Sequence, residues 1–382
     1  MEMNIKTSTQ PSQARRRILL SLLAAAAWLV GIVWVSSQIG VGGIFVGLPV
    51  SVLVTLPMVG VFVWLGRWKQ EPAQRLLPAF VWGAAGATFL SLVSQEGLLS
   101  LLNAKVGTDF TSWFQPLVIT PVTEEVFKGL FLIWLLIYCR RHIIGLLDGV
   151  IYGGFVGAGF AFTEQILYFG KIITQFAGSN PTDSGAAGLL IAGLALRALF
   201  VPFMHSFLVA IFGLGIAAAA GQRHRSAQVG FAGVGLVFAV ALHGVWDWAA
   251  LAGKDPLMLY KIYAAVMVPL FLSMVILALV LRRRQGRAVV TAMPILARDG
   301  EILAHEVVSL SSLKQRRQLR RNTRRRYGRP AARAIGRYQA EVSALGIMTL
   351  RAETTGNRDG LAEQANAVED ARSTMPESGL RR

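Results

Sequence analysis

Long apolar runs separated by short polar loops fill the first three quarters of the chain. Each run is close to the roughly 20 residues that a helix needs to cross a bilayer. Their residues are not spaced as on the half-apolar face of a soluble helix. The runs predict eight membrane-spanning helices, at about residues 18–36, 44–66, 77–101, 114–139, 144–169, 198–220, 227–252 and 258–281. The expected fold is therefore an all-α, polytopic membrane helix bundle over residues 18–281.

The composition and the loop charges agree with this class of protein. Of the 382 residues 54% are hydrophobic and only 15% are charged. Lysine and arginine collect in alternate loops, as they do on the cytoplasmic side of membrane proteins. This pattern places both termini in the cytoplasm, with residues 1–17 as a short N-terminal segment. The first run has no Ala-x-Ala cleavage site after it, so we interpret it as an uncleaved first span.

The region after the last span is strongly basic. Residues 282–382 hold 21 of the 38 basic and 10 of the 21 acidic side chains, so they contribute +11 of the net charge of +17. We expect residues 282–350 to be a basic cytoplasmic segment that lies on anionic lipid, at about 1 kcal/mol per basic residue near the surface. Nucleic-acid binding is the competing interpretation, which the membrane tether disfavours. The polar residues 351–382 are expected to be a disordered tail.

The fourth predicted span carries three charged residues where water is scarce. An ionised side chain near the bilayer centre costs about 2.5–3.5 kcal/mol on the most lenient scales. On a helix, Lys128 follows Glu124 by four residues and Glu125 by three, so it can neutralise either carboxylate. One carboxylate is left without a structural explanation.

Among the other predicted spans, three carry ionisable residues at a similar depth. Glu164 lies in the fifth, His205 in the sixth, and His243 and Asp247 share a face of the seventh. At 1.5 Å per residue, Glu124, Glu164 and the two histidines each lie about 10–16 Å inside the outer end of their spans. They therefore predict one site in the outer half of the bilayer. Because the chain has a single cysteine, any metal there must be held by His, Glu or Asp.

Four short motifs contain these residues in order along the chain: "EEVFK", "FAFTE", "PFMHS" and "HGVWD". Over about residues 114–250 this set resembles the PrsW family of intramembrane proteases, which belongs to the group that includes the CAAX prenyl endopeptidases and bacteriocin-processing enzymes. Two positions depart from the family pattern. Asp247 and Gln165 stand where asparagine is common.

The resemblance implies a role for each matched residue. Glu124 or Glu125 would be the general base that activates water. Glu164, His205 and His243 would bind a metal or position the water, and Asp247 would support them as a further catalytic residue. Lys128 and Phe160, from the first two motifs, would give structural support. Glutamate and histidine are suitable zinc ligands, and a metal-free mechanism stays open.

The activity that the resemblance implies is hydrolysis of a peptide bond in a membrane-associated protein near the outer membrane boundary. This is similar to the site-1 cleavage of membrane-bound anti-sigma factors, so a single-span protein is the expected substrate. Two alternatives come from the residues themselves. Buried Glu, Lys and His also form the proton relays of transporters, although the chain shows no clear internal repeat of the kind common in transporters. A catalytically silent scaffold, whose basic tail recruits a partner, is the other.

Overall fold

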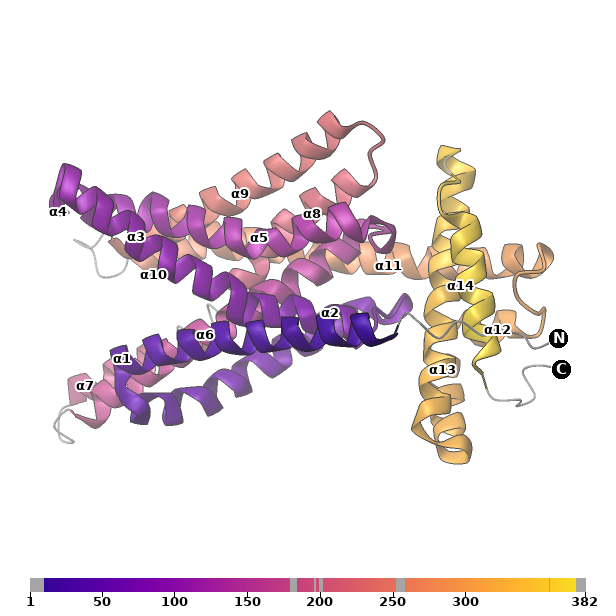
Figure 1. Ribbon diagram of the computed structural model, residues 1–382, viewed down its shortest axis with the longest axis horizontal. Helices are drawn as coiled ribbons and strands as arrows, with labels where there is room; N and C mark the ends of the chain where they lie inside the picture. The colour runs from indigo at the N-terminus through magenta and orange to yellow at the C-terminus, as the bar shows by residue number, and fades with distance from the viewer. Residues whose placement is uncertain are drawn as a thin grey trace.

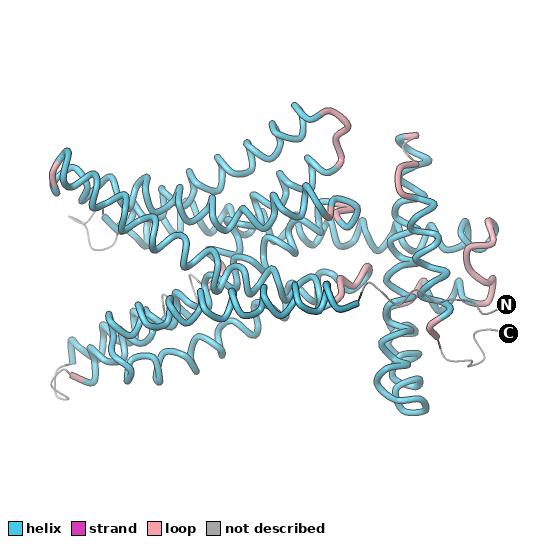
Figure 2. Tube along the Cα trace, viewed as in Figure 1, coloured by secondary structure: helices cyan, strands magenta, loops and turns pink. Residues whose placement is uncertain are grey.

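The computed structural model describes residues 10–178, 184–195, 197–198, 202–251, 258–356 and 358–375. These residues form helices joined by short loops, with no strand among them (Figure 2). The predicted all-α bundle is confirmed. The α-helices are α1 (Gln10–Leu65), α2 (Ala73–Val81), α3 (Thr88–Val106), α4 (Thr108–Phe114), α5 (Thr120–Tyr138), α6 (Leu146–Ala177), α7 (Ser184–Ala195), α8 (Met204–Ala220), α9 (Arg225–Leu251), α10 (Met258–Ile262), α11 (Val268–Arg298), α12 (Glu306–Leu310), α13 (Leu313–Thr355) and α14 (Leu361–Ser373).

Five stretches of helix in the described part of the chain are long and apolar enough to cross a membrane: Trp28–Trp68, Ala73–Val106, Leu146–Ala177, Arg225–Ala249 and Met258–Arg298. Helix α8 is a shorter apolar helix, and α5 is 19 residues long but carries three charged side chains. The first two predicted spans both fall on α1, which is interrupted at Gly40 by a positive φ of 71°. Figure 1 shows the chain folding back within α1. Of the predicted segments, residues 1–9, 199–201, 252, 357 and 376–382 lie outside the described residues.

Helix α6 occupies the centre of the bundle. Of its most apolar stretch 89% is buried, compared with 22% in α9. Its glycines allow close contact with α8, because a Cβ at Gly149 would overlap the Gly213 backbone and one at Gly157 would overlap the His205 carbonyl. Small residues at four-residue spacing favour such packing between membrane helices. A central position for this helix follows directly from those glycines.

After the last span the chain forms a C-terminal helical unit, which we define as residues 289–375 without residue 357. Helix α11 continues past the predicted end at residue 281 as far as Arg298. Figure 1 shows α13 and α14 lying crosswise to the long helices at one end of the bundle. The unit has a hydrophobic core of its own, formed by Val289, Ala292, Met293, Leu296, Ile302, Leu310, Ile335, Tyr338, Val342, Leu345, Val368, Ala371 and Met375.

The predicted disorder after residue 351 is wrong for residues 361–373. Helix α14 covers this segment and buries Val368 and Ala371 against the core of the unit. The side chain of Gln364 also donates to the Glu341 carboxylate at 2.8 Å. The apolar positions of α14 are few, so composition alone indicated a solvated tail. They nevertheless share one face, which α13 covers.

A buried ion cluster lies where the bundle meets the C-terminal unit. The Lys69 ammonium lies 2.6 Å from Glu71 and 2.9 Å from Asp148, which also accepts hydrogen bonds from backbone N–H groups ahead of α6. Burial raises the pKa of the Glu71 carboxyl, but the charges of Lys69 and Arg75 outweigh burial and lower it to about 2. Beside this cluster, the buried Arg316 of α13 donates to the Trp68 carbonyl at 3.0 Å. The junction therefore rests on buried ion pairs and hydrogen bonds, although Asp148 Oδ1 and Arg316 Nη2 have no hydrogen-bond partner among the described residues.

Candidate active site

The site is organised by α5, which follows a π-helical turn at Gln115–Ile119. Pro121 has no N–H to donate to the carbonyl of Leu117. That carbonyl lies against Gly244, where an added Cβ would be 2.9 Å from the oxygen. Helix α9 can therefore approach α5 at the residue next to His243. Single π turns inside helices are frequent at functional sites.

Lys128 joins the charged residues of α5 to a neighbouring helix. Its side chain is fully buried, and its Nζ lies 2.9 Å from Glu124 Oε2, 2.8 Å from Glu125 Oε1 and 2.9 Å from His205 Nδ1. The ammonium also lies 3.9 Å from the centre of the Phe160 ring. The sequence predicted that Lys128 can pair with either carboxylate. In the structure it pairs with both, and with a histidine that the spacing along α5 did not reveal.

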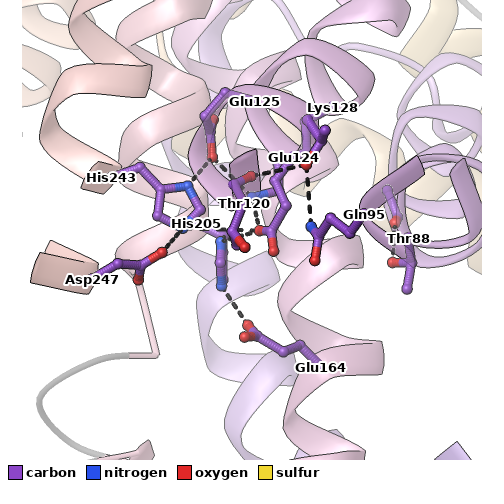
Figure 3. Close-up of polar contacts among 12 residues, drawn as sticks. Thr88, Gln95, Thr120, Glu124, Glu125, Lys128, Glu164, His205, His243 and Asp247 are labelled. Atoms are coloured by element: carbon purple, nitrogen blue, oxygen red, sulfur yellow. Dashed lines mark hydrogen bonds and ion pairs between the residues drawn. The ribbon is translucent and has the colours of Figure 1, made fainter. Parts of the chain in front are cut away.

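His205 is the second residue of α8 and links α5 to α6. Its Nδ1 contacts Lys128, and its Nε2 contacts the carboxylate of Glu164 on α6 (Figure 3). The ring of Phe160 lies 5.1 Å from the His205 ring, centre to centre. The close approach at Gly157 sets the distance between α6 and α8 here. Glu164 therefore lies on the far side of His205 from α5.

His243 of α9 lies on the opposite side of the two α5 carboxylates. Its Nδ1 is 2.9 Å from Glu125 Oε1, and its Nε2 is 3.9 Å from Glu124 Oε2 and 3.6 Å from Asp247 Oδ2. Figure 3 shows Asp247 reaching His243 from the same helix. The last two separations are too long for direct hydrogen bonds. The Glu124 and Asp247 carboxylates therefore lie on the Nε2 side of His243, where a water molecule can contact the imidazole together with either carboxylate.

The six predicted site residues lie at one level of the bundle. Counted at 1.5 Å per residue, the positions of Glu124, Glu164, His205 and His243 are about 21–27 Å along their helices from the ends next to the C-terminal unit. Exposure divides the six: the side chain of Glu125 is 1% exposed, whereas those of Glu164 and Asp247 are 21% and 20% exposed. The site is therefore most accessible on the side of Glu164 and Asp247.

The donor set at the centre fits a metal ion in part. Glu124, Glu125, His205 and His243 each offer a ligand atom within 4.8 Å of the others, and carboxylate oxygen and imidazole nitrogen are suitable zinc ligands. Glu164, which the sequence assigned to the metal, is separated from this group by the His205 ring. Lys128 is bonded to three of the four donors, so a metal ion would have to share their remaining lone pairs or displace the ammonium. The donor types fit zinc, and the position of Lys128 restricts where such an ion would bind.

Several supporting residues were not predicted. The Gln95 amide of α3 donates to Thr123 Oγ1 at 3.2 Å, and the Trp82 indole donates to the Phe127 carbonyl at 2.9 Å. Gln95 could have been identified from the sequence, because it is a polar residue within an apolar run. Trp82 could not, because a tryptophan in a span does not indicate a polar contact. The Arg197 guanidinium lies 3.4 Å from the centre of the Tyr168 ring. This contact holds Arg197 close to the Glu164 side of the site.

The bundle and the buried Glu, His and Lys residues define a polytopic membrane protein with a cluster of ionisable residues inside its helix bundle. Comparison with family models gives the particular family: the model described as PrsW family intramembrane metalloprotease matches residues 71–274. This range covers more than half of the chain and all of the site. The chain belongs to the PrsW family of intramembrane proteases. Searches of curated proteins and of solved structures found no match.

Proposed function

We propose that this protein is an intramembrane endopeptidase in which Glu124 activates the attacking water. The observation that carries the proposal is the convergence of Glu124 Oε2 and Asp247 Oδ2 on His243 Nε2, from which they lie 3.9 and 3.6 Å away. A water held there has one carboxylate to take its proton and two further polar groups to orient it. General-base catalysis requires this kind of direct reach between the base and the water.

Glu124 is a better general base than its neighbour Glu125. The same Glu125 oxygen accepts hydrogen bonds from both Lys128 and His243, and its side chain is almost completely buried. In Glu124 only Oε2 contacts Lys128, and 11% of the side chain is exposed. We therefore assign Glu125 to positioning His243 and Lys128, and Glu124 to proton transfer. Glu124 takes the proton of the water as its oxygen attacks the peptide carbonyl, and then returns the proton to the leaving amine.

The position of the site in the bundle supports cleavage near one membrane boundary. The four site helices place it remote from the ends next to the C-terminal unit. With that unit in the cytoplasm, as the loop charges indicate, the site lies in the outer half of a bacterial plasma membrane. The proposed substrate is a single-span membrane protein cut near its outer boundary. Site-1 cleavage of a membrane-bound regulator such as an anti-sigma factor is a reaction of this kind.

A metal ion is compatible with the same residues. Glu125, His205 and His243 would hold it, which leaves Glu124 as the base, and a bound zinc ion would supply Lewis-acid activation of water. The roles of the protein's own residues do not depend on it. Lys128 neutralises the α5 carboxylates, Glu164 orients the His205 ring, and Asp247 orients His243.

The test compares membrane-protein fragments in cells that make equal amounts of the wild type or of Glu124→Gln. We expect fragments of single-span proteins, cut near the outer boundary, with the wild type only. The matched control is Glu96→Gln, which changes another intramembrane glutamate whose partner is the Trp34 indole at 2.8 Å. Cleavage that continues at the wild-type rate in Glu124→Gln contradicts the assignment of the base.

A further inference from the structure

Helix α13 is a helical hairpin with an arginine-lined hollow at its turn. Gly328, with a φ of 84°, divides the helix into two arms. A residue with a side chain adopts this backbone conformation only with strain. The turn brings the second arm back along the first, so that Gly336 lies against the Arg320 side chain. A hollow of about 560 Å³ forms between the arms, lined by Arg317, Arg320, Arg321, Arg324, Arg329 and Arg333.

The arginines of this hollow carry uncompensated charge. All except Arg320 are exposed, and those five have no ion pair or hydrogen bond with any residue that the structure describes. Arg320 contacts the Gln70 side chain. Burial, together with the charges of Arg317 and Arg67, lowers the pKa of Arg320. Six guanidinium groups around one hollow, with no carboxylate in its lining, form a site for phosphate oxygens.

The hollow faces the membrane side of the C-terminal unit. Arg320 reaches Gln70, which follows the long first helix at the end of the bundle. Arg317 and Arg324 lie three residues before and four residues after Arg320, so they share its helix face. Figure 1 shows α13 crossing the end of the bundle and extending beyond the helices next to it. A helix crosswise to membrane spans lies parallel to the bilayer, so the overhanging part of this face is directed at lipid headgroups.

We propose that the arginine hollow of α13 binds the phosphate headgroups of anionic phospholipids. The hairpin thereby fixes the C-terminal unit to the membrane surface beside the bundle. Basic side chains near an anionic leaflet attract it, and guanidinium groups bind phosphate through paired hydrogen bonds. The proposal depends on the membrane-spanning bundle and on the position of α13, not on the proteolytic activity.

The test is native mass spectrometry of the full-length protein in neutral detergent, titrated with phosphatidylglycerol or with phosphatidylcholine. The variant Arg321→Gln/Arg324→Gln removes two charges from the hollow. The matched control, Arg325→Gln/Arg326→Gln, removes two exposed charges from the same arm that do not line it. We expect the wild type to prefer phosphatidylglycerol. The hollow variant should bind it about 30-fold more weakly, and the control should change by less than about threefold.

Three outcomes would overturn the proposal. Equal weakening in both variants would show attraction to the total charge instead of binding in the hollow. Displacement of the lipid by equimolar glycerol 3-phosphate would indicate a soluble phosphate ligand. Tighter binding of a labelled oligonucleotide, lost in the hollow variant, would assign the site to nucleic acid. Retention of lipid by Arg321→Lys/Arg324→Lys, together with the expected loss in the glutamine variant, would support it.

Discussion

Replacing Lys128 by methionine tests whether this residue holds the site together. Methionine keeps the unbranched shape and much of the volume of lysine but removes the charge. In the wild type the ammonium has no exposed surface and makes three polar contacts of 2.8–2.9 Å, to Glu124, Glu125 and His205. The substitution leaves two buried carboxylates and one ring nitrogen without this partner.

The expected loss of stability follows from the burial of those partners. Removing one member of a buried charge pair costs about 3–5 kcal/mol, because the remaining charge is left without compensation. The three contacts share one ammonium, so their energies do not add. We expect the free energy of unfolding to fall by about 3–5 kcal/mol in Lys128→Met. Removing Glu125 as well, in Lys128→Met/Glu125→Gln, should restore at least about 1 kcal/mol of this loss.

The assay is denaturant unfolding of purified protein in detergent micelles, monitored by tryptophan fluorescence. Lys171→Met is the matched control, since it removes one exposed ammonium from α6 and should change the free energy of unfolding by less than about 0.5 kcal/mol. If Lys128→Met is as stable as Lys171→Met, the three contacts do not stabilise the bundle. If the double variant is less stable than Lys128→Met by the full effect of Glu125→Gln, the two residues are not coupled.

Three further predictions concern the packing, the junction and the donor set. The methyl group of Gly157→Ala would overlap the His205 carbonyl. We therefore expect the free energy of unfolding to fall by about 1–3 kcal/mol and cleavage to be slower. The control Gly97→Ala has nothing within 4 Å of its Cβ and should be neutral or stabilising in the same unfolding assay. The Glu71 pKa is lowered from 4.5 to about 2, so its contribution is complete above pH 4.5 and is lost as the pH falls toward 2. It amounts to about 3 kcal/mol, and an unfolding profile against pH should be flatter in Glu71→Gln. If a metal is bound, its content in purified protein should fall in His205→Ala and His243→Ala but not in His142→Ala. Undiminished metal in the first two excludes both histidines as ligands.

The fold was predictable from the sequence where one physical signal dominated. Runs of apolar residues of bilayer length give the long helices, and glycines at four-residue spacing indicate that α6 is central. The tail was not predictable in the same way. Helix α14 contributes only a few apolar side chains, Val368 and Ala371 among them, to a core that belongs mainly to α11 and α13. The mean composition of the segment does not show that these few apolar residues share one face. The segment therefore resembles a solvent-exposed tail until the positions of α11 and α13 are known.

The site was predictable as a set of residues but not as a set of contacts. Ionisable side chains are costly inside an apolar span and are therefore rare there. Glu124, Glu164 and His205 can for this reason be recognised as candidate site residues from the sequence alone. Spacing along α5 also gives the pairs that Lys128 makes within its own helix. The contacts of His205 with Lys128 and of His243 with Glu125 join separate helices. They depend on how closely α8 packs against α6 and how closely α9 packs against the start of α5. Gly157 allows the first approach and Gly244 the second.

The charge balance of the site explains why a cation or protons must accompany it. Four carboxylates, those of Glu124, Glu125, Glu164 and Asp247, lie around one ammonium, that of Lys128. The Arg197 guanidinium, next to the Tyr168 ring on the Glu164 side, is a second cation. With neutral histidines the balance is two negative charges among largely buried groups, and uncompensated buried charge is costly. A divalent cation at the donor set or protons on the histidines and outer carboxylates would reduce the excess. Peptide hydrolysis uses both, since a divalent cation activates water and a proton is transferred to the leaving amine. The excess of negative charge therefore favours the binding of the same species that the reaction requires.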